Sequence, residues 1–210
     1  MPDQLNDSAE TQRLLMRIRE GEREAFNELF ARYRDRLRKA VELRLDPQLK
    51  ARIDASDIVQ EAQMQAYRRL DDYLAREPMP FGLWLRKTAQ QHLYNQRRNH
   101  VEAMKRTVRC EQALPEQSSL LIAQQFLQRG MSASKRFTKA EQRRVVIEAV
   151  ANLVDLDREI LLMRNVEGLS HREIAHVLGM NYDSVRKRYG RALLKLEQLL
   201  AERGISESDL

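Results

Sequence analysis

The sequence has little of what stabilises small secreted or β-rich proteins. Among its 210 residues only Cys110 is a cysteine, so no disulfide can form within the chain. Seven glycines and five prolines are too few for the many turns of an all-β fold. No apolar run reaches the roughly 18 residues of a membrane helix, and residues 1–20 lack the basic start and apolar centre of a signal peptide. We therefore expect a cytoplasmic protein without a membrane segment.

The sequence also lacks the residue patterns of common catalytic and metal sites. Its four histidines have no zinc-site spacing, and Cys110 has no second cysteine beside it. There is no Gly-rich phosphate loop and no Gly-x-Ser-x-Gly motif. The carboxylates between Asp54 and Asp72 have no Glu-x-x-His motif among them, which a helical two-metal site would need. We therefore predict no enzyme activity, no metal site and no cofactor.

Charge is the property that the chain has in excess. Lys and Arg number 37 against 31 Asp and Glu, which gives a net charge of +6 and an isoelectric point of about 9.6. Such a balance favours a polyanionic partner, either nucleic acid or an anionic membrane surface. Without a membrane-directed segment, nucleic acid is the favoured partner.

Residues 156–200 predict a helix-turn-helix. Gly168 and Gly179 divide the stretch into three helical pieces, because glycine readily adopts the positive φ that ends a helix. The first piece should start near Asp155, whose side chain can cap it. Ser170 is placed to cap the second, with Glu173 completing a capping box. Asn181 should cap the third, and the short Gly-containing turn between the second and third pieces is typical of this motif.

The third helix of this stretch has two different faces. Its apolar members recur at spacings of three and four and predict a buried stripe: Val185, Tyr189, Ala192, Leu193, Leu196 and Leu200. Asp183, Lys187, Gly190 and Arg191 point the other way, with Arg186 and Arg188 on the flanks. A buried stripe behind a basic N-terminal half suits a DNA major groove. An ordinary solvated face of a small helical domain is the alternative.

The rest of the chain predicts further helices and a two-domain, all-α protein. Residues 1–20 should be a frayed tail and a short helix that Gly21 ends, and a long amphipathic helix should follow over 22–45. Asp54 or Ser56 should open another helix that runs to Tyr73, and the loop from Ala75 to Pro80 precedes a helix that buries Trp84. We predict domains over 21–100 and 138–203, the second opened by a helix that Thr138 caps. Residues 101–137 should form a linker with one or two short helices.

Two groups of motifs resemble one protein family. Ser-Asp-Ile-Val-Gln-Glu at 56–61, Tyr-Arg-Arg-Leu-Asp at 67–71, and Phe81 with Trp84-Leu85 resemble region two of a bacterial RNA polymerase sigma factor. Leu-Asp-Arg-Glu-Ile-Leu from 156, Glu-Gly-Leu-Ser, Glu-Ile-Ala and Arg191-Ala192 resemble region four. The order and the small size are similar to the extracytoplasmic-function (ECF) group. The resemblance implies a protein that binds core RNA polymerase and directs promoter-specific transcription initiation.

The resemblance also implies partners and site residues in region two. Asp57, Gln60 and Glu61 would bind the β′ clamp helices, although an acid such as Asp57 also suits any helix N-terminus. The part that melts the promoter −10 element, and captures a flipped base in an aromatic or apolar pocket, would include Tyr73, Arg76, Phe81, Asn95, Arg97 and Arg98. The family's usual Ile-Ala-Arg-Asn run after Trp-Leu is absent at 86–92, so this resemblance does not imply a particular −10 sequence.

Region four would contact the promoter −35 element and the β flap of the polymerase. The implied −35 contacts are His171, Arg172, Tyr182, Ser184, Arg186, Lys187, Arg188 and Arg191. The connector between the regions would follow the RNA-exit path, and an anti-sigma factor is a further candidate partner. The competing hypothesis is a conventional dimeric helix-turn-helix regulator, with residues 1–100 as a sensor or dimerisation domain.

Overall fold

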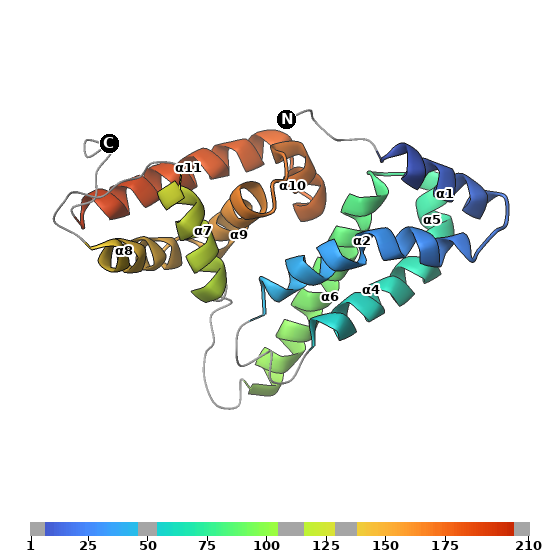
Figure 1. Ribbon diagram of the computed structural model, residues 1–210, viewed down its shortest axis with the longest axis horizontal. Coiled ribbons are helices and arrows are strands. Elements are labelled where there is room, and N and C mark those ends of the chain that lie inside the picture. The colour runs from blue at the N-terminus through green and yellow to red at the C-terminus, as the bar shows by residue number, and fades with distance from the viewer. Residues whose placement is uncertain (1–6, 46–53, 105–115, 129–137, 204–210) are drawn as a thin grey trace. The chain divides into compact units, whose positions relative to one another are not determined.

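The computed structural model describes residues 7–45, 54–104, 116–128 and 138–203, and the chain divides into two compact units near residue 110. All regular structure in these ranges is helical, which confirms the predicted all-α class. None of the helices there combines the length and apolar character that crossing a membrane requires. Each unit is described separately below, with the helices labelled in Figure 1.

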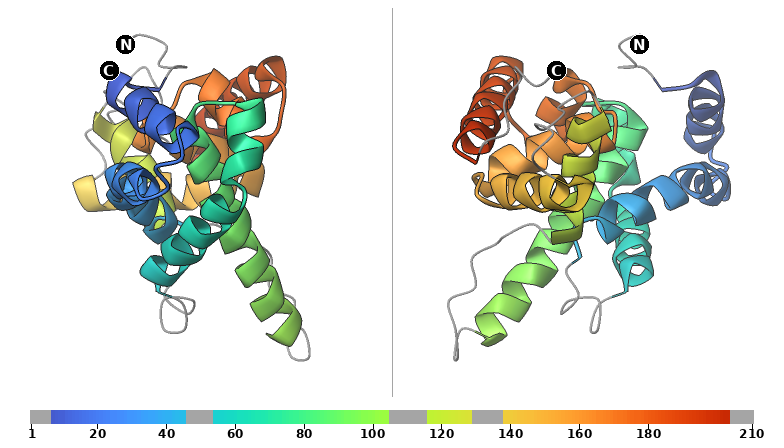
Figure 2. Two further views of the ribbon diagram at one scale, coloured as in Figure 1. Left: turned by 90° about the vertical axis from the view of Figure 1, so that its right-hand side faces the viewer. Right: turned by 60° about the vertical axis from the view of Figure 1, so that its left-hand side comes forward.

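The first unit consists of α1 (Ala9–Arg19), α2 (Ala25–Glu42), α4 (Ala55–Arg68), α5 (Leu70–Arg76) and α6 (Phe81–Met104). Helix α4 packs against both α2 and α6, and α1 packs against α2 (Figures 1 and 2). Amphipathic helices of this length must bury their apolar faces against one another. The first unit is therefore a small helical bundle.

Local signals fix several helix ends in this bundle as predicted. Gly21 follows the end of α1 and has a φ of 101°. The Asp54 side chain accepts a hydrogen bond from the Ser56 backbone N–H at 2.8 Å and so caps α4. The single helix predicted up to Tyr73 is interrupted at Arg69, so α4 and α5 are separate helices.

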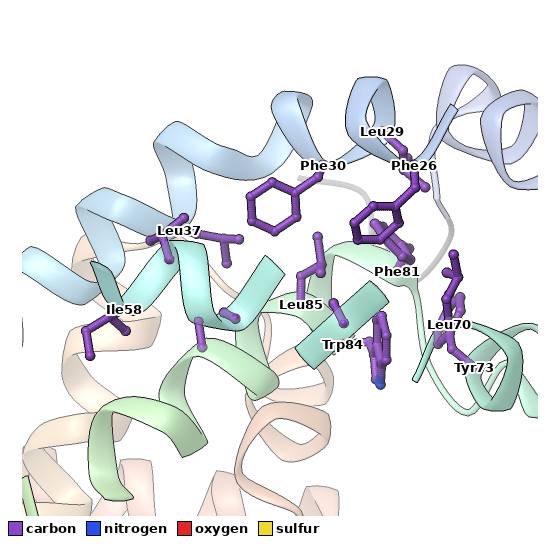
Figure 3. Packing of buried hydrophobic residues seen from close by; sticks show 14 of the residues in the cluster. Phe26, Leu29, Phe30, Leu37, Ile58, Leu70, Tyr73, Phe81, Trp84 and Leu85 are labelled. Atoms are coloured by element: carbon purple, nitrogen blue, oxygen red, sulfur yellow. The ribbon is translucent and has the colours of Figure 1, made fainter. Parts of the chain in front are cut away.

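The core of the first unit is rich in aromatic side chains. Phe26, Phe30, Phe81 and Leu85 are each no more than 1 % exposed and converge between α2 and α6 (Figure 3). Trp84 is 7 % exposed and stacks on Tyr73 with ring centroids 4.6 Å apart. The prediction that Trp84 packs in the core is confirmed.

The second unit contains α7 (Glu116–Gln128), α8 (Lys139–Ala151), α9 (Asp155–Leu161), η1 (Leu162–Val166), most of α10 (His171–Leu178) and α11 (Tyr182–Ala201). Thr138 caps α8 as predicted and forms a capping box with Glu141. Helix α7 lies within the predicted linker, yet it packs on α8 and η1 and buries Ile122 and Ala123 there. It is therefore part of the second unit, and the linker is shorter than 101–137.

The segment before the helix-turn-helix departs from a regular α-helix. Leu162–Val166 is a π-helical turn, where the sequence pattern predicts an uninterrupted helix. The capping role expected of Asp155 is wrong, because Val154 occupies the N-cap position and Asp155 is the first helical residue, ion-paired with Arg158. Gly168 has a φ of 75° and ends the segment as predicted.

Candidate nucleic-acid interface

Helices α10 and α11 form the predicted helix-turn-helix, with only residues 179–181 between them. Ser170 and Glu173 form the predicted capping box: the Ser170 N–H donates to the Glu173 carboxylate at 2.7 Å, and the Glu173 N–H donates to Ser170 Oγ at 3.2 Å. Gly179 has a φ of 65°, and Asn181 Oδ1 accepts the Ser184 N–H at 2.7 Å. Local side-chain caps thus fix where both helices begin.

Helix α11 buries one face and exposes its basic N-terminal half. Val185, Ala192, Leu196 and Leu200 are at most 1 % exposed, and α11 packs against α9 and α8. The first half of the helix carries exposed Tyr182, Arg186, Lys187 and Arg191, of which Lys187 and Arg191 lie opposite the buried stripe. Three positive charges on the outer face of a rigidly packed helix suit contacts to phosphates and base edges.

The N-terminal turn of α10 adds to this exposed surface. Arg172 is exposed, and its guanidinium carbon lies 5.8 Å from the centroid of the Tyr182 ring. Ser184, in the first turn of α11, is half-buried. Of the eight residues predicted to contact the −35 element, five are therefore exposed on these two helices: Arg172, Tyr182, Arg186, Lys187 and Arg191.

Arg188, another predicted DNA contact, forms an ion pair within the second unit. Its guanidinium Nη1 donates to the Asp157 carboxylate of α9 at 3.0 Å, and both side chains are partly buried. A guanidinium held in this way is turned toward the interior of the unit. Arg188 thus joins α11 to α9, and its contact with DNA stays a prediction.

His171 is also less suited to phosphate binding than its sequence position implies. Its ring is half-buried, with its centroid 4.9 Å from that of Tyr189 and 6.5 Å from that of Tyr182. Burial, followed by the positive charges of Arg164 and Arg186, lowers the pKa of His171. The ring is thus kept neutral near pH 7 and packs against tyrosines rather than presenting a cation.

Asn165 and Tyr189 form a polar contact that the sequence analysis missed. The Tyr189 hydroxyl donates to Asn165 Oδ1 at 3.2 Å, and Asn165 Nδ2 donates to the Leu161 carbonyl at 3.0 Å. Asn165 belongs to the π-helical turn and is 7 % exposed. The sequence gives no signal for this contact, because Asn165 reaches Tyr189 only through the changed register of the π-helical turn.

The second candidate surface lies around the loop between α5 and α6 in the first unit. Arg76 at the end of α5 is exposed, as are Asn95 and Arg98 on α6. The side chain of Arg97 lies outside the described residues. The exposed residues can follow a nucleic-acid backbone, since they are polar or positively charged.

Tyr73 and Phe81 do not form an open base pocket. Their side chains are 3 % and 0 % exposed, with ring centroids 5.4 Å apart (Figure 3). The Tyr73 hydroxyl donates to the Met79 carbonyl at 3.0 Å. The prediction that these rings receive an unstacked base is therefore corrected: they form the core directly beneath the loop.

Helix α4 presents a third surface. Asp57 and Gln60 are exposed and Glu61 is half-buried. Gln60 borders a shallow hollow of about 500 Å³ between α2 and α4, which Met64 and Tyr67 also line at 41 % and 45 % exposure. Acidic and amide groups beside exposed apolar side chains suit docking of a partner protein.

The described residues contain no group of three His, Cys, Asp or Glu side chains arranged to hold a metal ion. What they do contain is a helical bundle and a separate helix-turn-helix unit with a basic outer face. These features define a two-domain DNA-binding protein.

Comparison with known proteins specifies that class. Residues 29–102 match the family described as Sigma-70 region 2, and residues 143–196 match Sigma-70, region 4. The chain is 27 % identical over 197 residues to the ECF RNA polymerase sigma-E factor of Haemophilus influenzae, covering 94 % of this chain and 96 % of the relative. It is 29 % identical over 192 residues to the sigma-E factor of Escherichia coli, covering 91 % and 93 %.

Solved structures agree with these relatives. The structure of CnrH in complex with the cytosolic domain of CnrY is 25 % identical, with a TM-score of 0.53, and the match covers 90 % of this chain and 96 % of that one. The sigma factor RpoE of Bartonella quintana, in complex with the anti-sigma factor NepR, has the same fold at a TM-score of 0.54 and 18 % identity, covering 84 % and 96 %. The chain belongs to the sigma-70 family, in the ECF group, and is a sigma factor that directs transcription initiation.

Proposed function

We propose that this sigma factor binds core RNA polymerase through α4, contacts the promoter −35 element through α10 and α11, and opens the −10 element with the α5–α6 loop and α6. The observation that carries this proposal is that one chain has both regions, each with an exposed surface of suitable chemistry. The covalent chemistry of transcription belongs to the polymerase, and the chain acts in the cytoplasm, where the polymerase is.

Arg186, Lys187 and Arg191 are the principal −35 contacts in this proposal, with Tyr182, Ser184 and Arg172 at the edge of the interface. Support comes from the exposure of these three cations, since Lys187 and Arg191 lie opposite the buried stripe of α11 and Arg186 lies on its flank. Arginine and lysine there can bind phosphates or the O6 and N7 atoms of guanine. His171 and Arg188 support this surface from the interior side rather than touching DNA.

Arg76, Asn95, Arg97 and Arg98 are the proposed −10 contacts. Positive charge along α6 supports a path for the phosphate backbone of the separated strand. The loop from Glu77 to Pro80 is the place where an unstacked base would be captured. Tyr73 and Phe81 hold that loop from below, as their burial and the Tyr73 hydrogen bond to Met79 indicate.

Asp57, Gln60 and Glu61 are the proposed contacts to the β′ clamp helices. The exposure of Asp57 and Gln60 beside Met64 and Tyr67 supports this surface, because protein interfaces combine apolar anchors with a polar rim. The β flap is the proposed partner of the second unit. An anti-sigma factor is a further proposed partner, since the sigma factor RpoE of Bartonella quintana was solved with the anti-sigma factor NepR.

The test is titration of the protein against purified bacterial core polymerase, followed by run-off transcription from a library of random promoters. Tight association and new start sites that share −35 and −10 sequences would support the proposal. A homodimer that binds a palindromic DNA site without polymerase would instead support the conventional regulator.

A further inference from the structure

Two residues near the ends of α1 contact the two ends of the loop between α5 and α6. Arg19 pairs with Glu77 at the start of the loop, and Asp7 binds Phe81, the first residue of α6 after the loop. Arg19 and Asp7 both lie before residue 29, where the region 2 match begins. We propose that Asp7 and Arg19 are positioning residues that hold the loop Glu77–Pro80 and the first turn of α6 in the shape that captures the separated −10 strand. The inference rests on the proposed function of this loop.

Asp7 holds the start of α6. Its two carboxylate oxygens accept the Phe81 backbone N–H at 3.0 and 2.9 Å, across 74 positions of the sequence. The first N–H groups of a helix have no partner within the helix, so a carboxylate there satisfies them and complements the helix dipole. Asp7 is half-buried, and it thereby fixes the direction in which the chain leaves the loop and enters α6.

Arg19, at the other end of α1, holds the start of the loop. Its guanidinium is ion-paired with the Glu77 carboxylate, and Nη2 lies 3.5 Å from the Leu74 carbonyl. Glu77 has a φ of 37° and a ψ of 57°, a left-handed conformation that is uncommon for a residue other than glycine. A strained residue keeps its conformation only when its surroundings impose it, and Arg19 supplies such a contact.

A third set of contacts transmits the position of α1 to the same loop. The Thr11 and Tyr33 hydroxyls are 2.8 Å apart, and the Tyr33 ring lies against Gly82 in the first turn of α6. A Cβ atom on Gly82 would be 2.5 Å from Tyr33 Cε1, so only glycine permits this approach. Tyr73 adds its hydrogen bond to the Met79 carbonyl. The loop and the turn after it are thus held at Leu74, Glu77, Met79, Phe81 and Gly82.

A loop that is already in its bound shape loses less conformational entropy when it binds a single strand. Loss of Asp7 or Arg19 should therefore weaken strand capture while leaving polymerase binding and −35 binding unchanged, because α4 and α11 are not part of this contact. For Asp7→Ala we expect the affinity for the single strand to fall about fivefold, which corresponds to the free energy of one helix-capping interaction. Arg19→Ala should have a smaller effect, because its ion pair with Glu77 is exposed.

The experiment uses the full chain with core polymerase and a promoter selected from a random library. Binding to a single-stranded oligonucleotide of the −10 non-template strand is measured together with permanganate reactivity of thymines in the duplex promoter. The variants are Asp7→Ala, Arg19→Ala and the double variant. Glu10→Ala and Arg13→Ala are the matched controls, because these two side chains pair with each other on α1.

Weaker oligonucleotide binding and slower opening in the Asp7 and double variants, with normal polymerase affinity, would support the proposal, and the melting temperature should fall only by the amount that the loss of one helix cap explains. Exchange of charge in Arg19→Glu with Glu77→Arg should restore part of the loss. Wild-type strand capture in both single variants and the double variant would overturn it, as would an equal loss of polymerase binding, which would show general unfolding. If the wild type itself fails to open any promoter, the proposed function fails instead.

Discussion

Asp157 on α9 and Arg188 on α11 form an ion pair with a donor–acceptor distance of 3.0 Å. Their side chains are 18 % and 33 % exposed, so the pair is more shielded from water than the surface pairs of the chain. One residue along, Tyr189 donates to Asn165 of the π-helical turn. The exposed face of α11 is therefore oriented by two polar contacts in addition to its apolar stripe.

The first prediction concerns this ion pair. Arg188→Ala should lower the stability of the second unit by about 1 kcal/mol, because it leaves the Asp157 carboxylate partly buried and unpaired. It should weaken −35 binding while leaving the salt dependence of binding unchanged, since no phosphate contact is lost. Thermal unfolding and DNA titration at several salt concentrations measure the two effects. Partial rescue by Asp157→Arg with Arg188→Asp supports a pairwise contact, and a reduced salt slope in Arg188→Ala would restore Arg188 to the DNA contacts.

The second prediction concerns Arg191, which is exposed on the same helix. Arg191→Ala should weaken −35 binding and reduce the slope of log Kd against log salt by about 0.9, the value for one phosphate contact. Stability should be unchanged, because the side chain is not packed. Lys195→Ala is the control, since Lys195 is exposed in the C-terminal half of α11. An unchanged slope together with unchanged transcription would remove Arg191 from the interface.

The helix ends could be predicted because their causes are local. Ser170 with Glu173, Asn181, Thr138 and Gly168 each act within a few residues of themselves, and each behaves in the structure as its position implies. The buried face of α11 could also be predicted, because its apolar stripe follows from the spacing of residues within one helix.

What could not be predicted depends on contacts between distant parts of the chain. Arg188 lies on the flank of its helix, and only its partner 31 residues away decides whether it faces DNA or α9. Tyr73 and Phe81 were assigned to base capture because aromatic residues near a loop suit both a core and a stacking surface. In the structure Tyr73 packs against Trp84 and Phe81 packs against Tyr33, so both rings belong to the core. The contact of Asp7 with Phe81 could not be predicted either, because the two residues are 74 positions apart in the sequence.

The third prediction concerns the polymerase-binding surface. Asp57→Ala should reduce affinity for core polymerase while leaving the fold intact, because Asp57 is exposed in the first turn of α4 and Asp54 supplies the cap. The loss should be about 1–2 kcal/mol, the range for one charged contact at an interface. Asp72→Ala is the control, since it removes an exposed carboxylate from the first turn of α5. Equal affinities for wild type and Asp57→Ala would assign polymerase binding to another surface.

The fourth prediction concerns pH and His171. Burial and the charges of Arg164 and Arg186 hold its pKa below the ordinary value. On acidification the imidazole of the unfolded chain therefore takes up its proton before that of the folded chain. The stability that this difference provides is fully present above the unfolded pKa of about 6.5 and is lost as the pH falls through the lower folded pKa.

Wild type should consequently lose more stability than His171→Gln between about pH 7.5 and pH 5.5. Urea unfolding at several pH values measures this difference. Arg172→Gln is the matched control, because it removes a neighbouring charge that does not titrate in this range, and its curve should run parallel to that of wild type. Parallel curves for wild type and His171→Gln would mean that neither burial nor the two arginines lowers the pKa of His171. A steeper loss in wild type would establish that the folded chain favours the neutral imidazole of His171.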